Sequence, residues 1–201
     1  MEWKKTCIGS YTSEILRHSV HYGPWVCAKC GAGESHFRCH SCIGVNVIWC
    51  ENCCIEVHQQ APFHRIQQWN GRCFSRTDLN ELGLIIEAGH SGEECHSGGE
   101  REIGTVKIGH STGIFVRRIR WCQCVDEETS SPVPKDVQLL RLCLYPATTS
   151  HPETAFTFAC LKDFHLQAVE CKTVALKYLT KLRRATCLLS PRLVPVRKVL
   201  Q

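Results

Sequence analysis

The sequence lacks any long hydrophobic run. Its first twenty residues, MEWKKTCIGSYTSEILRHSV, contain no apolar stretch of signal-peptide length, and no later segment approaches a membrane span. We therefore expect a protein of the nucleus or the cytoplasm that is not secreted and has no membrane partner. Those compartments are reducing, and dense cysteine in a reducing compartment indicates metal binding rather than disulfides.

The sequence is also poor in ordinary core residues. Hydrophobic residues make up 43% of the 201 positions, but that fraction includes 16 cysteines. Such a thin core needs extra support, which disulfides or metal would supply. The 11 histidines favour metal, because His is a common zinc ligand and forms no disulfide. The net charge of +5 does not by itself identify a nucleic-acid binder.

Composition and periodicity predict a small α+β protein stabilised by zinc. We expect a loosely ordered N-terminal segment (1–24), a two-zinc module (25–66), a β-rich region with a further zinc site (67–125), a linker (126–136), a helical region (137–184) and a basic tail (185–201). The β-rich region should hold a short helix around Thr77–Leu82, a strand through Leu84–Glu87, and a hairpin formed by TVKIG and GIFVRRIRWCQC.

An apolar stripe predicts a long C-terminal helix. Apolar residues recur in steps of three and four at Leu161, Phe164, Ala168, Cys171, Ala175, Tyr178 and Leu182. We expect this helix to pack onto its own domain, with a coiled-coil partner as the alternative. From Lys172 onward the chain has eight Lys or Arg and no acid, which indicates a solvated face and a frayed tail, or else phosphate contact or a nuclear import signal.

Four ligand pairs follow one another in the segment 25–66. They are Cys27/Cys30, Cys39/Cys42, Cys50/Cys53 and His58/His64. A C-x-x-C turn directs two thiolates at one ion, and zinc takes four N or S ligands, so eight ligands make two closed sites. Interleaving predicts a cross-brace, with Cys27, Cys30, Cys50 and Cys53 in site one and Cys39, Cys42, His58 and His64 in site two. The alternative is sequential pairing, an all-cysteine site followed by a mixed site.

The other interpretations of this cluster are weaker. Inert buried thiols rarely produce three C-x-x-C units, and a thioredoxin-like pair requires a βαβ setting that is missing. Catalytic zinc is disfavoured because every ligand has a partner and no H-E-x-x-H motif is present. Cys54 is a spare thiol that could replace Cys53, and His36 and His40 are expected at the surface. The closing His pair resembles ZZ and B-box modules, which bind protein segments, rather than a RING finger.

A second constellation surrounds a C-x-C at the end of a predicted strand. Cys122 and Cys124 lie on one side of that strand, and a local bend would let them share an ion with His90 and Cys95. The competing ligands are His96 and His110, and the alternative is unrelated buried thiols. The remaining cysteines are isolated and are expected to be packing or free thiols: Cys7, Cys73, Cys143, Cys160, Cys171 and Cys187.

Several stretches, in this order, resemble a known family. FRCHSC, WCENCCIEVHQQAPFHRIQQWNG, LGLIIEAGH, WCQC and VQLLRLCLYPATTSHPETAFTFACLKDFH, from about Trp25 to Leu182, look like the CxC-type cysteine cluster associated with Kyakuja-Dileera-Zisupton (KDZ) transposases, a family abundant in fungi. The resemblance implies that Cys122 and Cys124 are the namesake C-x-C and that His90 and Cys95 belong with them. Many members carry a His where this chain has Phe115, and His110 is a candidate for its shifted counterpart.

The resemblance also implies a catalytic domain that this sequence does not show. In KDZ transposases an RNase H-type nuclease core, whose carboxylates hold divalent metal ions, should follow the long helix. The acidic residues here form no recognisable metal-binding set, and the text after Leu182 departs from the family. The expectation is a truncated, solitary accessory domain of a mobile element, without enzymatic activity.

The leading hypothesis is a non-enzymatic module with two to three Zn²⁺ per chain that binds DNA or chromatin. It takes no small-molecule substrate. The candidate nucleic-acid contacts are Arg117, Arg118, Arg120, Lys181, Arg183 and Arg184. The alternatives are a protein-interaction adaptor of ZZ or B-box type and a non-functional transposon relic. A ubiquitin ligase or an intact transposase is disfavoured.

Overall fold

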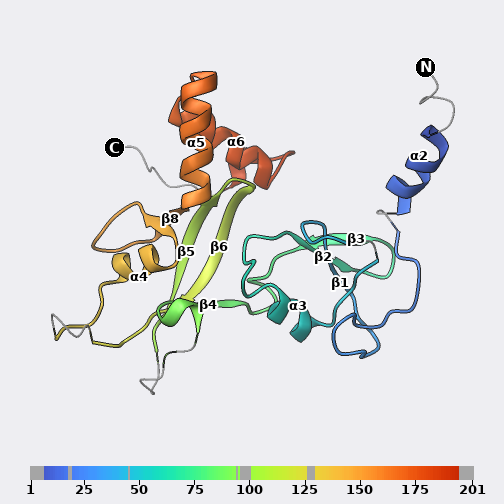
Figure 1. Cartoon of the computed structure of the whole chain (residues 1–201), viewed down its shortest axis with the longest axis horizontal. Coiled ribbons are helices and arrows are strands. Elements are labelled where there is room, and N and C mark those ends of the chain that lie inside the picture. The colour runs from blue at the N-terminus through green and yellow to red at the C-terminus, as the bar shows by residue number, and fades with distance from the viewer. Residues whose placement is uncertain are drawn as a thin grey trace. The chain divides into compact units, whose positions relative to one another are not determined.

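The computed structural model divides the chain into two compact units, Met1–Leu84 and Ile85–Gln201. It describes residues 7–17, 20–44, 46–93, 95, 101–125 and 130–194. Each unit has its own β-sheet (Figure 1). Among the described residues, no helix is long and apolar enough to cross a membrane.

The first unit is built on a three-stranded antiparallel sheet in the order β1-β2-β3. Its elements are α2 (Ile8–Arg17), β1 (Phe37–Cys39), α3 (Glu51–Val57), β2 (Ile66–Trp69) and β3 (Phe74–Thr77). A tight turn joins β2 to β3, because the Asn70 side chain accepts the backbone N–H groups of Arg72 and Cys73. This hairpin pairs with β1, and the first unit extends to Leu84, so residues 67–84 belong to it, whereas the sequence placed them in a separate β-rich region.

The first unit differs from the expectations in two places, one where a helix was not expected and one where an expected helix does not form. The segment 1–24 contains α2, whose apolar residues Ile8, Tyr11 and Ile15 all remain exposed, so this helix buries no residue. The helix expected around Thr77–Leu82 is absent, and turns occupy 79–83 instead. There the Asp78 side chain accepts the N–H of Asn80, which favours a turn over a helix.

The second unit is built on a five-stranded mixed sheet in the order β4-β6-β5-β8-β7. Its strands are β4 (Ile85–Glu87), β5 (Ile103–His110), β6 (Gly113–Arg120), β7 (Leu144–Pro146) and β8 (Thr154–Thr157). The expected hairpin is confirmed, with β5 and β6 paired antiparallel from Ile103↔Arg120 to His110↔Gly113. The strand expected at Leu84–Glu87 is β4, which runs parallel to β6.

The prediction of one long C-terminal helix from the apolar stripe is wrong, because this region forms a strand and two helices. The helices of the second unit are α4 (Lys135–Arg141), α5 (Phe158–Cys171) and α6 (Ala175–Thr186), with short 3₁₀ turns η1 (His90–Gly92) and η2 (Pro191–Leu193). Thr157 caps α5 by accepting the N–H of Cys160, and Lys172 ends it in a left-handed conformation with φ of 50°.

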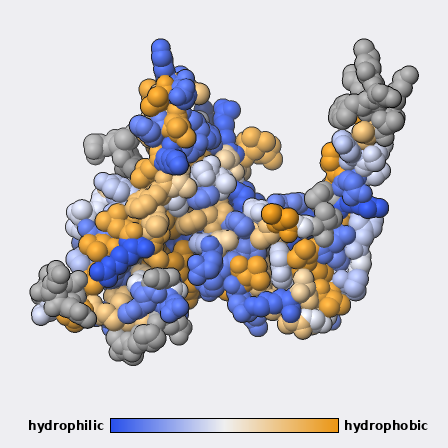
Figure 2. All heavy atoms as spheres, in the orientation of Figure 1, coloured by the Kyte–Doolittle hydropathy of each residue, from blue (hydrophilic) through white to orange (hydrophobic). Residues whose placement is uncertain are grey.

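One apolar cluster explains why the stripe continued across this break. Cys160 of α5 and Tyr178 and Leu182 of α6 are buried together, and Phe156 and Phe164 pack against them. Both helices therefore turn their apolar positions toward the same core. Their outer faces are mixed, and Figure 2 shows hydrophobic and hydrophilic side chains side by side on α5.

Candidate metal centres

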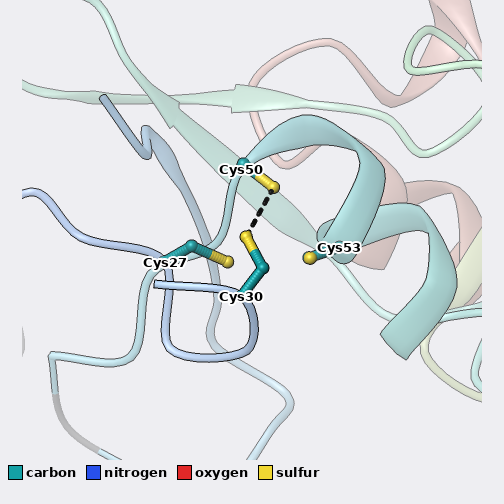
Figure 3. A group of neighbouring side chains, drawn as sticks. All are labelled: Cys27, Cys30, Cys50 and Cys53. Carbon is teal, nitrogen blue, oxygen red and sulfur yellow. Dashed lines mark hydrogen bonds between the residues drawn. The ribbon is translucent and has the colours of Figure 1, made fainter. Parts of the chain in front are cut away.

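The first group of ligands joins a loop to the start of α3. Cys50 is the N-cap of α3 and Cys53 lies in its first turn, while Cys27 and Cys30 come from a loop closed by the hydrogen bond from the N–H of Cys27 to the carbonyl of Ala32. The four sulfurs lie within 4.8 Å of one another and point into a common space (Figure 3). The Cys30 and Cys50 sulfurs are 3.8 Å apart.

The electrostatics of this group favour a cation. Burial would raise the pKa of the Cys27 thiol, but backbone hydrogen bonds from Cys30, Cys50 and Lys29 outweigh burial and lower that pKa to about 6. The hydrogen bond with Cys50, followed by burial, raises the pKa of Cys53 to about 12. Without metal, the cluster therefore cannot hold four thiolates at neutral pH. A divalent cation would stabilise all four and release the protons.

The second group combines two cysteines with two histidines. Cys39 ends β1, Cys42 follows in the next turn, His58 is the C-cap of α3, and His64 lies in the loop before β2. The Cys42 sulfur lies 3.5 Å from Nε2 of His58 and 3.4 Å from Nδ1 of His64, and the Cys39 sulfur lies 3.7 Å from the same Nδ1. The first and third sequence pairs thus meet in one group, and the second and fourth in the other.

Hydrogen bonding fixes which nitrogen of His58 faces this group. Nδ1 lies 2.7 Å from the backbone carbonyl of Cys54, so Nδ1 carries the proton and Nε2 presents its lone pair to the sulfurs. Burial lowers the pKa of His64, which favours its neutral, metal-binding form. Burial also raises the pKa of Cys54 to about 12, and this fully buried thiol stays outside both groups.

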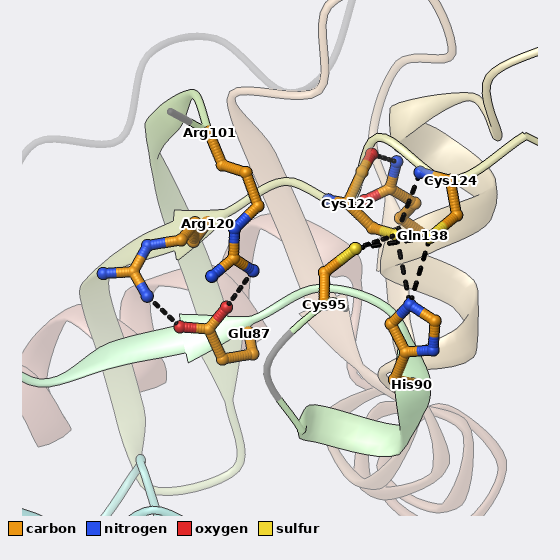
Figure 4. Close-up of polar contacts among 8 residues, drawn as sticks. All are labelled: Glu87, His90, Cys95, Arg101, Arg120, Cys122, Cys124 and Gln138. Carbon is orange, nitrogen blue, oxygen red and sulfur yellow. Dashed lines mark hydrogen bonds and ion pairs between the residues drawn. The ribbon is translucent and has the colours of Figure 1, made fainter. Parts of the chain in front are cut away.

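The third group lies in the second unit, at one end of its sheet. His90 begins η1 after β4, Cys95 follows, and Cys122 and Cys124 come just after β6. Nε2 of His90 lies 3.3 Å from the Cys124 sulfur and 3.6 Å from that of Cys122. Cys95 completes the group, with its sulfur 3.5 Å from Cys122 and 3.3 Å from Cys124 (Figure 4).

Two neighbours position the C-x-C. Gln138 of α4 is buried, and its side chain donates to the carbonyl of Cys122 and accepts the N–H of the same residue, both at 2.9 Å. Gly89 adopts φ of 99°, and a Cβ there would lie 2.8 Å from Cβ of Cys122. Cys122 and Cys124 lie beyond the end of β6 rather than in the strand where the sequence placed them. Hydrogen bonds with an amide side chain and close contact with a glycine hold the backbone that lets both face one ion.

The spacing of the ligand atoms fits a tetrahedral ion. With Zn–S of about 2.3 Å and Zn–N of about 2.0 Å, sulfurs lie about 3.8 Å apart and a sulfur and a nitrogen about 3.5 Å apart. The sulfur–sulfur distances of 3.3–3.8 Å and sulfur–nitrogen distances of 3.3–3.7 Å are close to these values. All three groups offer only the N and S atoms that zinc prefers, and each could hold a metal ion.

Of the other histidines considered, the three that the structure describes, His36, His40 and His110, lie outside these groups. Nδ1 of His36 donates to the carbonyl of Glu34, His40 is exposed and contacts Gln67, and His110 contacts Thr112 in the β5–β6 turn. His96 lies outside the residues that the structure describes. Phe115, where the family pattern would place a His, is buried beside His110, with ring centroids 6.2 Å apart.

The basic residues next to the C-x-C do not form one exposed edge. Arg117 is completely buried, because positions 115, 117 and 119 of β6 face inward, and its guanidinium donates to the carbonyl of Val116. This burial corrects the expectation that Arg117 contacts nucleic acid. Arg120 is held by Glu87, which also binds Arg101 at 3.0 Å (Figure 4). Arg118 is partly buried.

The basic residues of α6 are arranged differently. Lys181 and Arg184 are exposed and Arg183 is partly buried. Lys177, which the sequence analysis did not single out, is exposed as well, and the spacing 177, 181 and 184 follows one helix face. Helical periodicity could have identified Lys177. Nothing in the sequence pattern marked Gln138, whose role depends on tertiary contact with Cys122.

Together, the fold and these clusters define a mixed α+β protein whose described residues include three groups suited to metal ions, one of cysteines alone and two of cysteines with histidine. The family model for CxC2-like cysteine clusters associated with KDZ transposases matches residues 79–189, more than half of the chain, so the chain belongs to this family. The third group lies inside the matched segment, and the first two lie before it. Comparisons with curated proteins and with solved structures found no match.

Proposed function

We propose that the chain is a non-enzymatic, zinc-stabilised module of a KDZ-type transposase that binds duplex DNA through α6. The zinc assignment is supported by the ligand chemistry of the three groups. Each has four N or S ligands and no fifth candidate within the described residues, which is the pattern of a closed structural site. The interleaved pairing in the first unit supports a cross-brace of the ZZ or B-box kind.

The observation that carries DNA binding is the exposed face of α6. Lys177, Lys181 and Arg184 project from one side of this helix, whereas Tyr178 and Leu182 on the other side are buried against the second unit. No acidic residue occurs in α6. Lys181 lies 2.7 Å from Asp163 of α5, so the strongest phosphate contacts are expected from Lys177 and Arg184. A helix presenting cations at this spacing can follow a phosphate backbone.

Salt dependence of the affinity tests this proposal. Duplex DNA should bind the zinc-loaded chain with an affinity that falls steeply between about 50 mM and about 200 mM salt, because phosphate contact releases counterions. The variant Lys177→Ala/Arg184→Ala should bind more weakly and lower the slope of log K against log salt by roughly 2. Arg141→Ala at the exposed end of α4 is the matched control. Equal slopes for both variants, or no binding at low salt, would disprove DNA binding through α6.

A protein-interaction adaptor is the second candidate, and α2 is the observation that favours it. This helix exposes Ile8, Tyr11, Ile15 and Leu16 by 53–67% each. Amphipathic helices with such a stripe commonly dock against protein partners. Partners that remain bound after nuclease treatment, and that are lost with Ile8→Ser/Ile15→Ser, would favour the adaptor over the DNA-binding module.

A further inference from the structure

The outer face of the β1–β2–β3 sheet carries a cluster of aromatic rings. Trp69 and Phe74 are direct partners across β2 and β3, and their ring centroids lie 5.2 Å apart. Trp25 packs against both, at 5.2 Å from Trp69 and 6.1 Å from Phe74. All three rings are partly exposed, so part of each remains accessible to a ligand. The cluster therefore forms an aromatic surface on the first unit.

A basic and polar row lies beside this aromatic surface. Strand register places Arg38, Gln67 and Arg76 opposite one another, on the same face as Trp69 and Phe74. The guanidinium of Arg38 lies 3.7 Å from the centroid of Phe74, and its Nε donates to Gln67 at 2.9 Å. The three strands contain no acidic residue. The whole face thus combines aromatic rings with positive charge.

A small basic pocket adjoins this face. Its lining includes Arg17, His21, Arg38 and His40, together with Asn46, and contains no carboxylate. Arg17 is ion-paired with Glu14, which lies 2.9 Å away on the same helix. Four basic side chains converging on one pocket favour an anion.

The His21 ring connects the pocket to the aromatic surface. Its centroid lies 4.5 Å from that of Trp25. Nε2 of His21 faces the carbonyl of Pro24 at 3.3 Å and therefore carries a proton, while the buried Nδ1 has no hydrogen-bond partner. Arg38 forms a second connection, because it both lines the pocket and covers Phe74.

We propose that this surface binds single-stranded nucleic acid, with an unpaired base stacked on Trp25, Trp69 and Phe74 and a neighbouring phosphate in the basic pocket. Aromatic rings beside cations are the usual means of holding unpaired bases, since every base offers a π-face to stack and every nucleotide a phosphate. Duplex bases are already stacked on one another and cannot reach the rings. A methylated lysine would fit the rings but would be repelled by Arg38 and by the pocket.

This site goes beyond the proposed function, because it lies in the other unit, uses other residues and selects unpaired bases. The test is titration of the zinc-loaded full chain with oligothymidylate of about 12 nucleotides, followed by fluorescence anisotropy and tryptophan emission. Stacking should quench emission of the wild type. Arg38→Gln and Trp69→Leu should each weaken binding at least about tenfold, and Trp69→Leu should also reduce the quenching.

Matched controls separate this site from α6 and from loss of fold. Lys29→Gln, a change of the same kind at an exposed residue of the same unit, should bind as the wild type does. Lys177→Ala/Arg184→Ala should keep single-strand binding even if duplex binding is lost. Zinc content must be unchanged in each variant. If Trp69→Leu does not fold, Arg17→Gln/His40→Gln takes its place, with weaker binding as the expected result.

Three outcomes would overturn the proposal. The first is the absence of single-strand binding at low salt. The second is equal affinity in Arg38→Gln, Lys29→Gln and the wild type. The third is displacement of the oligonucleotide by a phosphopeptide of matched charge at equal or lower concentration, which would assign the surface to a protein ligand instead.

Discussion

The side chain of Gln138 forms hydrogen bonds with both backbone groups of Cys122. Its Oε1 accepts the Cys122 N–H and its Nε2 donates to the Cys122 carbonyl, each at 2.9 Å, while the same Nε2 lies 2.8 Å from the carbonyl of Val133. One buried amide therefore satisfies three backbone groups next to the third metal group. Hydrogen bonds of this kind, made to the backbone of a ligand residue, orient the ligand and so determine how tightly an ion is held.

Gln138→Ala should therefore weaken metal binding at the third group by about 10- to 100-fold, while the first two groups keep their metal. The substitution leaves the buried N–H and carbonyl of Cys122 without this partner, at a cost of about 1–3 kcal/mol each. Competition with a chromogenic zinc chelator measures the effect as one ion released earlier than the others. Gln123→Ala, at the exposed position between the two cysteines, is the control and should release metal as the wild type does.

Metal analysis of the reduced protein should give three zinc ions per chain, one for each group. The double variant Cys122→Ser/Cys124→Ser should give two, and Cys73→Ser, which changes an exposed thiol, should still give three. Burial raises the pKa values of Cys42 and Cys122 to about 11, so uptake of zinc should release protons near neutral pH. Fewer than two zinc ions per wild-type chain would contradict the assignment of two metal sites to the first unit.

The metal groups were more predictable than the fold around them. C-x-x-C spacing is a local property, since a tight turn suffices to bring Cys27 and Cys30 together, and the pairing then follows from which turns meet. The helix α3 was not expected, because its seven residues are too few for a periodic signal and its buried side chains, Cys53 and Cys54, were assigned to metal or left as spare.

Sequence periodicity failed where two elements share one core. The stripe from Leu161 to Leu182 suggested one helix, but Lys172 takes a left-handed conformation and the chain turns back, so that Tyr178 meets Cys160. Arg117 was expected at the surface for a similar reason: an arginine in a basic run looks solvated until the strand is placed in its sheet. Both errors concern tertiary contacts, which no local pattern encodes.

Gly89→Ala should disrupt the third group more than its small change in volume suggests. The backbone at Gly89 has φ of 99°, which L side chains rarely adopt, and the new Cβ would meet Cβ of Cys122 at 2.8 Å. We expect a loss of about 2 kcal/mol in the stability of the zinc-loaded second unit, and weaker zinc binding there. Chemical denaturation followed by Trp121 fluorescence, with the other four tryptophans (Trp3, Trp25, Trp49 and Trp69) replaced by Phe in both proteins, provides the measurement.

Gly92→Ala is the matched control for this prediction. Gly92 also has a positive φ, 93°, but a Cβ there would meet no atom within 4 Å. It therefore shares the backbone strain without the contact with Cys122. Equal loss of zinc affinity in the two variants would show that strain alone, rather than the approach to Cys122, explains the effect.

Asp163 should make the second unit sensitive to acid. Hydrogen bonds from Lys181 and Tyr178, with that from Gln167, hold the pKa of the Asp163 carboxyl below its ordinary value of 3.8. As the pH falls, Asp163 therefore binds a proton at a higher pH in the unfolded chain than in the folded one. The stabilisation is complete above about pH 5 and disappears as the pH falls through the folded-state pKa. At neutral pH, Asp163→Asn should be less stable than the wild type by about 1 kcal/mol, and this difference should shrink on acidification.

Thermal unfolding between about pH 7 and about pH 3 measures this difference in stability, with Glu170→Gln on the exposed face of α5 as the control. Both variants keep every metal ligand, so loss of zinc at low pH affects them alike. A constant difference between Asp163→Asn and the wild type across that range would contradict the ion pair.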